Sequence, residues 1–161
     1  MKKPVFLYYN RMGAIPMADF ISVERGKMGR VAYARIAPNE DLVIGIEKLC
    51  LSQGFRNAFV RGALGSLVDA CLEACDGGVI EVKGPAVEIV SLAGEVRSDA
   101  DGTPCASLSG VVADPEGKVY GGPFVSGLNP ICMTFEVTLE EWLPETGESS
   151  RCGEWGHEKG G

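Results

Sequence analysis

Only one segment of this chain has the pattern of an amphipathic α-helix, and this restricts the folds that the chain can adopt. The pattern follows Asn39-Glu40-Asp41, where Asn39 can cap a helix and two carboxylates enter its first turn. It ends at Gly54, because glycine favours the left-handed conformation at a helix end. The apolar residues that share one helical face are Leu42, Ile46, Leu49 and Cys50.

Most of the remaining chain has the pattern of β-strands. Residues 31–36 alternate apolar and other side chains, as a half-buried strand does. Asp114-Pro115-Glu116-Gly117 has the residue order of a tight turn, and it predicts a hairpin between strands at 107–113 and 118–125. One helix and many strands predict an α+β fold. Further strands are expected at 58–61, 67–73, 86–94 and 131–139.

The segment that follows the helix is less regular. Gly62 and Gly65 bracket a bend that is expected at 62–66. Residues 67–73 continue as a strand, although Cys71 and Cys75 at i, i+4 also fit a short helix.

The two ends of the chain differ in character from its centre. We expect an irregular basic arm at 1–29, one domain at 30–143, and a polar, disordered tail at 144–161. Residues 1–37 carry seven basic and two acidic side chains, whereas the other 124 residues carry eight basic and twenty acidic ones. Because phosphate binding requires clustered Lys and Arg, only the arm is suited to contact DNA.

The basic arm contains a run that is similar to a minor-groove binding motif. Arg25-Gly26-Lys27-Met28-Gly29-Arg30 is similar to the Arg-Gly-Arg core of an AT-hook, which places arginines in a narrow, AT-rich minor groove. The proline that follows this core is missing, and Lys27 replaces the middle arginine. A flexible basic loop is therefore the alternative interpretation. In either case Arg25, Lys27 and Arg30 are the candidate DNA-contacting residues.

The cysteines and the apolar segments indicate a cytoplasmic protein. The six cysteines lie mostly in apolar stretches, so buried reduced thiols are expected rather than three disulfides. No apolar run is long enough to cross a bilayer, and the apolar start at 4–7 is too short for a signal peptide. Cys152 and His157 do not by themselves make a closed metal site.

Several motifs resemble those of the plants-and-prokaryotes-conserved (PPC) domain family. Residues 39–42 and 60–67 are similar to that family's helix start and to its glycine-serine bend. Residues 88–94, EIVSLAG, and 113–122, ADPEGKVYGG, resemble one of its strands and its hairpin. Residues 134–137, TFEV, are similar to its closing strand. The resemblance covers about residues 30 to 140 in order.

The resemblance implies a twisted, mostly antiparallel β-sheet packed with one main helix, related in shape to acetolactate decarboxylase. It also implies assembly as a homotrimer, and members of the family are commonly described as DNA-binding. In plants the domain accompanies AT-hook motifs and mediates self-association and partner contacts. The expected function is that of a non-enzymatic, oligomeric binding module with a DNA role and no membrane attachment.

The chain departs from the family pattern at the positions of a metal site. Many prokaryotic members have two histidines before the hairpin turn and one after it, and these three suit a divalent metal such as zinc. Here the matching positions are Ser107, Ser109 and Pro123. Serine hydroxyls are poor zinc ligands, and the proline side chain has no donor atom. We therefore expect no metal at this site and no other cofactor.

Without a histidine in the domain, an enzyme would have to use other titratable groups. The candidates are Glu88, Glu95 and Glu136 together with Arg35 or Arg61. The alternative is that these residues form ion pairs between strands or subunits. We favour the ion pairs and expect no enzyme activity.

Two other functions remain open for this fold. A small-molecule pocket, or a degenerate enzyme-like site, could lie near the hairpin or between subunits. A purely structural oligomer whose partner lies elsewhere also fits the acidic body of the chain. The residues expected to line the pocket are Ser91, Ser107, Ser109, Pro123 and Glu136.

Overall fold

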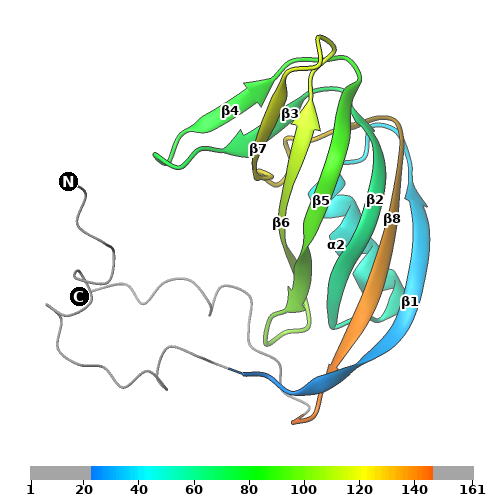
Figure 1. Ribbon diagram of the computed structural model, residues 1–161. Coiled ribbons are helices and arrows are strands. Elements are labelled where there is room, and N and C mark those ends of the chain that lie inside the picture. The colour runs from blue at the N-terminus through cyan, green and yellow to red at the C-terminus, as the bar shows by residue number, and fades with distance from the viewer. Residues whose placement is uncertain (1–22, 147–161) are drawn as a thin grey trace, which may run out of the picture.

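The computed structural model describes residues 23–146, which form one large sheet, one two-stranded ribbon and one helix (Figure 1). The large sheet has six strands in the order β1-β8-β2-β5-β6-β7, and every neighbouring pair is antiparallel. Strands β3 and β4 form the separate ribbon. The elements are β1 (Gly26–Ile36), α2 (Leu42–Gln53), β2 (Asn57–Leu67), β3 (Ala70–Glu73), β4 (Val79–Val82), β5 (Val87–Ser98), β6 (Pro104–Ala113), β7 (Val119–Pro123) and β8 (Ile131–Pro144). The expected α+β fold with a mostly antiparallel sheet is confirmed.

Helix α2 lies where it was expected, but its first residue has a different cap. The side chain of Asp41 accepts hydrogen bonds from the backbone N–H groups of Val43 and Ile44, each at 3.0 Å. Asn39 is not the cap, because it lies two residues earlier with a φ of 67°. Gly54 ends the helix in the left-handed conformation, as the sequence predicts.

Strand β2 runs straight through the segment where a bend was expected. Irregular registers between Val60 and Gly62, and between Gly65 and Leu67, show that the strand bulges there instead of ending. Gly65 has a φ of 146°, and a Cβ atom at this position would lie 2.3 Å from the carbonyl oxygen of Thr134. Gly65 therefore permits close strand packing, and the short helix considered at 67–75 is replaced by β3.

The hairpin predicted around residues 114–117 is confirmed, as strands β6 and β7 pair on either side of it. The carboxylate of Asp114 accepts hydrogen bonds from the backbone N–H groups of Glu116 and Lys118 at 2.9 and 2.8 Å. The N–H of Gly117 donates to the carbonyl of Asp114 at 2.9 Å. These bonds form because Asp and Gly stand at the positions that a tight turn requires.

The sheet extends further at both ends than the sequence indicated. Strand β1 begins at Gly26, so the basic run at 25–30 is mostly a strand and not a flexible loop. Strand β8 continues to Pro144 and pairs with this early part of β1. The rest of the expected arm and tail, including Cys152 and His157, lies outside the described residues.

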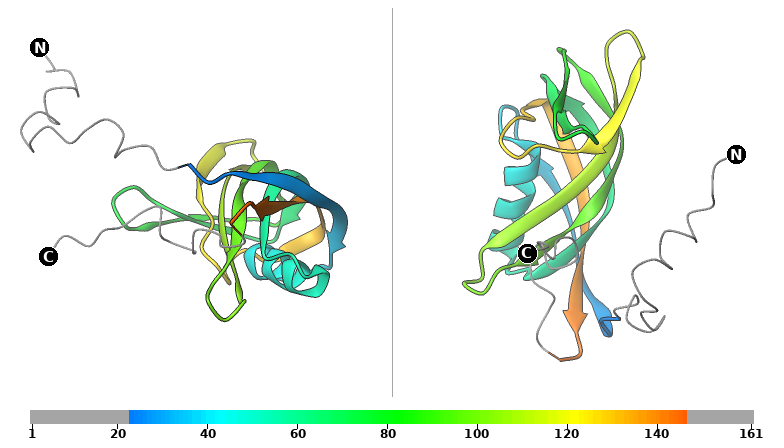
Figure 2. Two further views of the ribbon diagram at one scale, coloured as in Figure 1. Left: turned by 90° about the horizontal axis from the view of Figure 1, so that it is seen from below. Right: turned by 90° about the vertical axis from the view of Figure 1, so that its left-hand side faces the viewer.

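Helix α2 and the β3-β4 ribbon pack against one face of the large sheet and enclose the hydrophobic core (Figures 1 and 2). No helix or strand of residues 23–146 covers the opposite face, which we call the open face. Within those residues, no helix has the length and apolar character needed to span a bilayer. The largest fully buried side chains include Phe135, Leu42, Ile46, Leu67, Leu72, Ile131 and Leu139.

The cysteines follow the expectation of reduced thiols only in part. Cys50 and Cys71 are buried free thiols, and burial raises the pKa of Cys50 to about 12. Cys75 and Cys132 are also free. Cys105 is disulfide-bonded, so the expectation is wrong at this residue.

Candidate interaction face

The open face presents alternate residues of all six strands, because neighbouring side chains of a strand point to opposite sides of a sheet. In-register pairs place side chains of different strands next to one another, such as Arg35 beside Glu136 and Ser109 beside Pro123. The residues that define this face are Val31, Tyr33, Arg35, Phe59, Arg61, Leu64, Ser91, Ala93, Glu95, Ser107, Ser109, Pro123, Glu136 and Glu140.

Large apolar side chains on this face are exposed. The exposed fraction is 64% for Val31, 68% for Tyr33 and 55% for Leu64. Val90, in the bulge of β5, is 58% exposed. Contiguous exposed apolar surface on a folded domain commonly marks a protein interface.

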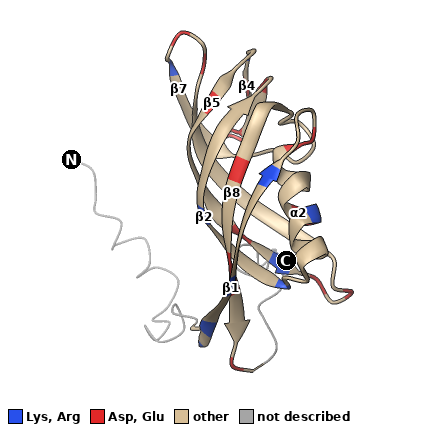
Figure 3. Ribbon diagram, turned by 90° about the vertical axis from the view of Figure 1, so that its right-hand side faces the viewer, with Lys and Arg blue, Asp and Glu red and all other residues tan. Residues whose placement is uncertain are grey.

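The charged side chains of the open face are paired with one another. Arg35 forms an ion pair with Glu136, which also accepts a hydrogen bond from the hydroxyl of Tyr33 at 2.5 Å. The bonds from Tyr33 and Arg35 hold the pKa of Glu136 below its ordinary value. Figure 3 shows the acidic position on β8 beside the basic position on β1. The preferred interpretation, an inter-strand ion pair, is thus confirmed for Arg35 and Glu136.

A second polar cluster lies around Arg97 near the end of β5, and no motif of the sequence indicated it. Arg97 is only 7% exposed and pairs with Glu95 and Glu24 at 2.9 Å each. Glu24 also accepts a hydrogen bond from the indole N–H of Trp142. The guanidinium of Arg97 lies 5.6 Å from the ring centre of Phe59.

The remaining expected ion pairs are distributed differently from the prediction. Arg61 pairs with Glu140 at 2.7 Å, a residue that was not among the candidates. Glu95 pairs with Arg97 and not with Arg35 or Arg61. Cross-strand register decides these partners, and register is not visible in the sequence.

The residues expected to line a pocket near the hairpin all lie on the open face, but they do not converge. Ser109 lies opposite Pro123, and Ser107 and Ser91 are exposed on the neighbouring part of the same surface. Glu136 lies on β8, three strand spacings from β6, which is about 14 Å. These five residues therefore form part of a broad surface and not one enclosed site.

The positions that match the family's metal ligands do not fit a metal. Ser107, Ser109 and Pro123 lie close together on β6 and β7, so the geometry that brings such ligands together is present. Two hydroxyls and a proline ring, however, do not supply the nitrogen, thiolate or carboxylate donors that zinc requires. Across residues 23–146, no three His, Cys, Asp or Glu side chains gather into a possible metal site.

Of the three candidate DNA-contacting residues, Arg30 has extensive contacts within the domain. Its guanidinium binds both carboxylate oxygens of Glu141 at 2.7 and 2.8 Å. It also donates to the backbone carbonyls of Gln53 and Gly54 at the end of α2, and it lies 4.6 Å from the ring centre of Phe55. Arg25 and Lys27 are exposed beside it.

Comparison with protein families gives a match over most of the described residues. The model of the Plants and Prokaryotes Conserved (PCC) domain matches residues 23–143. The bifunctional protein GlmU of Synechococcus sp. strain JA-3-3Ab is 31% identical over 117 residues. That match covers 71% of this chain but only 17% of the relative, so this chain spans a small part of that protein's length.

Solved structures of low sequence identity share the fold. A plant- and prokaryote-conserved (PPC) protein of Pyrococcus horikoshii is 23% identical, with a TM-score of 0.64 over 81% of this chain and 87% of that one. The metal-containing protein AF0104 of Archaeoglobus fulgidus is 24% identical, with a TM-score of 0.65 over 78% and 88%. A candidate DNA-binding protein of Bacteroides thetaiotaomicron is 16% identical, with a TM-score of 0.61 over 71% and 80%.

Proposed function

Because this chain belongs to the Plants and Prokaryotes Conserved (PCC) domain family, we propose that it is a self-associating binding module without catalytic activity. The observation that carries this proposal is the open face. An uncovered sheet with several exposed apolar side chains is costly to leave in water, and a second copy of the chain would cover it.

The paired charges of the open face favour burial in an interface. Glu136 and Glu140 already have cationic partners in Arg35 and Arg61 within the same chain. A charge that is paired and hydrogen-bonded costs less to desolvate than an isolated charge. The face therefore combines apolar contact area with charges that need no partner from the other subunit.

We propose that three copies associate through this face, as the family resemblance implies. A substitution of Leu64 tests this assembly, because the side chain of Leu64 is exposed on β2 next to Glu136. Leu64→Arg is tolerated by a single chain, but it places a charge in the proposed interface. We expect its mass in solution, measured by light scattering after size-exclusion chromatography, to fall from three chains to one.

Leu51→Arg is the matched control for this experiment. Leu51 is 65% exposed on helix α2, which lies on the other side of the sheet from Leu64. Its substitution changes charge and size equally and leaves the mass at three chains. An unchanged mass for Leu64→Arg, with an intact circular dichroism spectrum, contradicts assembly through the open face.

We further propose that the module contacts DNA through its basic N-terminal segment. The support is the excess of basic side chains in residues 1–37 and the DNA-binding description of a structural relative from Bacteroides thetaiotaomicron. Within the described part of this segment, Arg25 and Lys27 are the proposed phosphate contacts. Arg30 is not included, because its guanidinium already binds Glu141.

The hairpin site is proposed to have lost the metal that other family members hold. Its support is the donor chemistry of Ser107, Ser109 and Pro123, which does not suit zinc. We expect elemental analysis of the purified protein to find no stoichiometric zinc, and the triple substitution of these positions by histidine to introduce it. Stoichiometric zinc in the unaltered protein that is lost when Ser107 and Ser109 are replaced by alanine contradicts the proposal.

We also propose a cytoplasmic location, supported by the free thiols of Cys50, Cys71, Cys75 and Cys132. Cys105 is the exception within the described residues. Fractionation of cells that produce the tagged chain tests this location, and recovery in an oxidising compartment contradicts it.

A further inference from the structure

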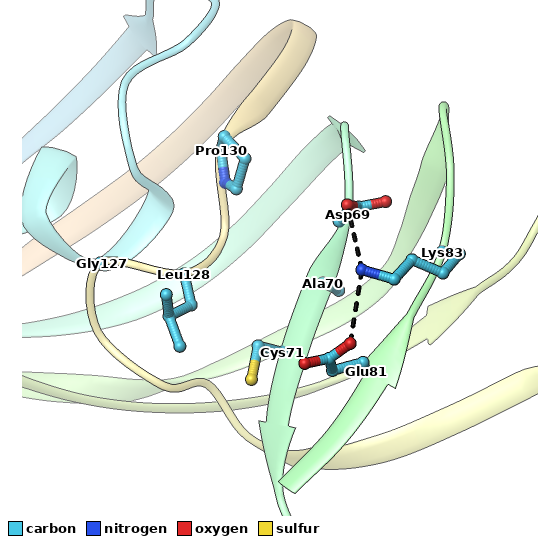
Figure 4. Close-up of a pocket in the computed structure, with 8 residues that line it drawn as sticks. All are labelled: Asp69, Ala70, Cys71, Glu81, Lys83, Gly127, Leu128 and Pro130. Atoms are coloured by element: carbon cyan, nitrogen blue, oxygen red, sulfur yellow. Dashed lines mark ion pairs between the residues drawn. The ribbon is translucent and has the colours of Figure 1, made fainter.

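A cavity of about 300 Å³ lies between the β3-β4 ribbon and the loop at 127–130, outside the open face (Figure 4). This volume is at the lower end of the range for small-molecule sites. Since a water molecule occupies about 30 Å³ in the liquid, the cavity has room for about ten non-hydrogen atoms. It is lined by Asp69, Ala70, Cys71, Glu81, Lys83, Gly127, Leu128 and Pro130.

The ribbon builds one wall of this cavity from alternating residues. Cys71 pairs in register with Glu81, so both side chains lie on the same face of the ribbon. Asp69 and Lys83 continue this face by two residues. On the other face of the ribbon, Leu72 and Val82 are buried in the core. The polar wall is thus held in place by the apolar side of the same ribbon.

The loop that forms the opposite wall is fixed by a buried asparagine. Asn129 is fully buried, and its side-chain oxygen accepts a hydrogen bond from the N–H of Cys71 at 2.8 Å. Its amide nitrogen donates to the carbonyl of Val125 at 2.6 Å, and its backbone N–H donates to Asp41 at 2.7 Å. The cavity is therefore formed before any ligand binds, which lowers the entropic cost of binding.

The charges of the cavity leave an excess of one negative charge. Lys83 lies between Asp69 and Glu81, at 3.5 and 3.4 Å from their carboxylate oxygens. The N–H of Gly84 binds Asp69 at 2.8 Å and, with the charge of Lys83, holds the pKa of that carboxyl below its ordinary value. Lys83 is 70% exposed, so its ammonium group can move into solvent when another cation enters.

The floor of the cavity includes a free thiol that is nearly buried. Cys71 is only 6% exposed, and it is not in a disulfide. Together with Ala70, Leu128 and Pro130 it gives the cavity an apolar surface beside the carboxylates. A site with an apolar floor and a net negative rim suits a ligand with an apolar body and one positive charge.

We propose that this cavity binds a small organic amine, whose ammonium group lies between the carboxylates of Asp69 and Glu81 while its apolar body contacts Leu128 and Pro130. The amine takes the place of the Lys83 ammonium group, which turns outward. This site is independent of the proposed self-association and DNA contact, since its residues lie outside both surfaces.

Titration calorimetry with benzylamine tests the proposal, with benzyl alcohol and benzoate as neutral and anionic analogues of the same shape. We expect benzylamine to bind at least ten times more tightly than either analogue. Glu81→Gln and Asp69→Asn each weaken binding about fivefold or more, whereas Glu116→Gln in the hairpin turn, the matched control, has no effect. Equal binding of the three compounds overturns the proposal.

Lys83→Met is expected to change the affinity for benzylamine in the opposite direction. Removing the competing ammonium group leaves two uncompensated carboxylates, so benzylamine should bind more tightly to this variant. Weaker binding to Lys83→Met overturns the proposed exchange. Repeating the titration with Leu64→Arg separates the two proposals, because the amine site is expected to keep its affinity whatever the mass of that variant.

Discussion

Arg30, a candidate DNA contact in the sequence, forms an ion pair with Glu141 within the domain. In the sequence Arg30 ends a basic run that is similar to a DNA-binding motif. In the structure Glu141 is only 7% exposed, and Arg30 supplies both its side-chain and its backbone N–H groups to that carboxylate. The arginine therefore stabilises the contact between β1 and β8.

Arg30→Met is expected to lower the free energy of unfolding more than Lys27→Met does, because it leaves the carboxylate of Glu141 without its charged donors. Urea unfolding followed by fluorescence measures this change. Lys27→Met on the same strand is the control, and it should change stability by about 0.5 kcal/mol or less. Equal effects of the two substitutions would mean that Arg30 has no structural role beyond its charge.

The ion pair between Arg30 and Glu141 makes the free energy of unfolding depend on pH. The hydrogen bonds from Arg30 lower the pKa of Glu141, so its contribution is complete above the pKa of an unfolded glutamate, about 4.3. It is lost as the pH falls through the lower pKa of the folded state. The stability difference between the wild type and Arg30→Met should therefore shrink below about pH 4.5. A difference that stays constant down to pH 2 contradicts this linkage.

The sequence predicted that these charged residues form ion pairs, but it did not predict which residues pair with each other. Arg35 and Arg61 were alternative partners for Glu136, and the register of β1 and β8 selects Arg35. The partner of Glu95 is Arg97, two residues along the same strand, which was not among the candidates. Exposed, uncovered positions such as Leu64 could not be identified, because burial depends on which elements cover a sheet.

At the scale of secondary-structure elements, helix α2 depends on one aspartate that joins it to a distant loop. One oxygen of Asp41 accepts the N–H groups of Val43 and Ile44, and the other accepts the N–H of Asn129 at 2.7 Å. The cap thus fixes both the first turn of the helix and the loop before β8.

Asp41→Ala is expected to lower the free energy of unfolding by about 2 kcal/mol, the upper part of the range for a lost helix cap. Thermal unfolding followed by circular dichroism at 222 nm measures it. Asn39→Gly is the control, because glycine accepts the φ of 67° at that position without strain. A larger loss of stability for Asn39→Gly than for Asp41→Ala would mean that Asn39, and not Asp41, is the helix cap.

Elements with local signals were predicted well, and elements that depend on distant contacts were not. The turn at 114–117 and the helix end at Gly54 follow from their own residues. The bulges of β2 were interpreted as a bend, because the close approach of Gly65 to the backbone of β8 is not visible in the residues around Gly65. Strand β4 was missed, since its four residues pair only with β3.

At the scale of the whole molecule, charge is separated between the N-terminal segment and the acidic remainder. Many of the basic side chains in the described domain already form ion pairs, which reduces their ability to attract phosphate. The ion-paired basic residues are Arg30, Arg35, Lys48, Arg61, Lys83 and Arg97.

The combined substitution Arg25→Gln and Lys27→Gln is expected to weaken DNA binding and to reduce its salt dependence. Each lost phosphate contact should lower the slope of log affinity against log salt by about 0.9. Fluorescence anisotropy with a labelled duplex over a range of salt concentrations measures the slope. Lys48→Gln with Lys118→Gln removes the same charge elsewhere, and an equal loss for this pair would contradict a role for the N-terminal segment.

The order of the strands in the sheet determines when the chain can fold during its synthesis. Strand β8 lies between β1 and β2, so these two strands, the first among residues 23–146, gain their common partner only when β8 has left the ribosome. Until then β1 and β2 each have an edge without a partner, and the two pairings that β8 makes join parts of the chain that are far apart in sequence. Such a topology folds slowly after synthesis, and nascent chains that stall before β8 would be exposed to aggregation and to chaperones.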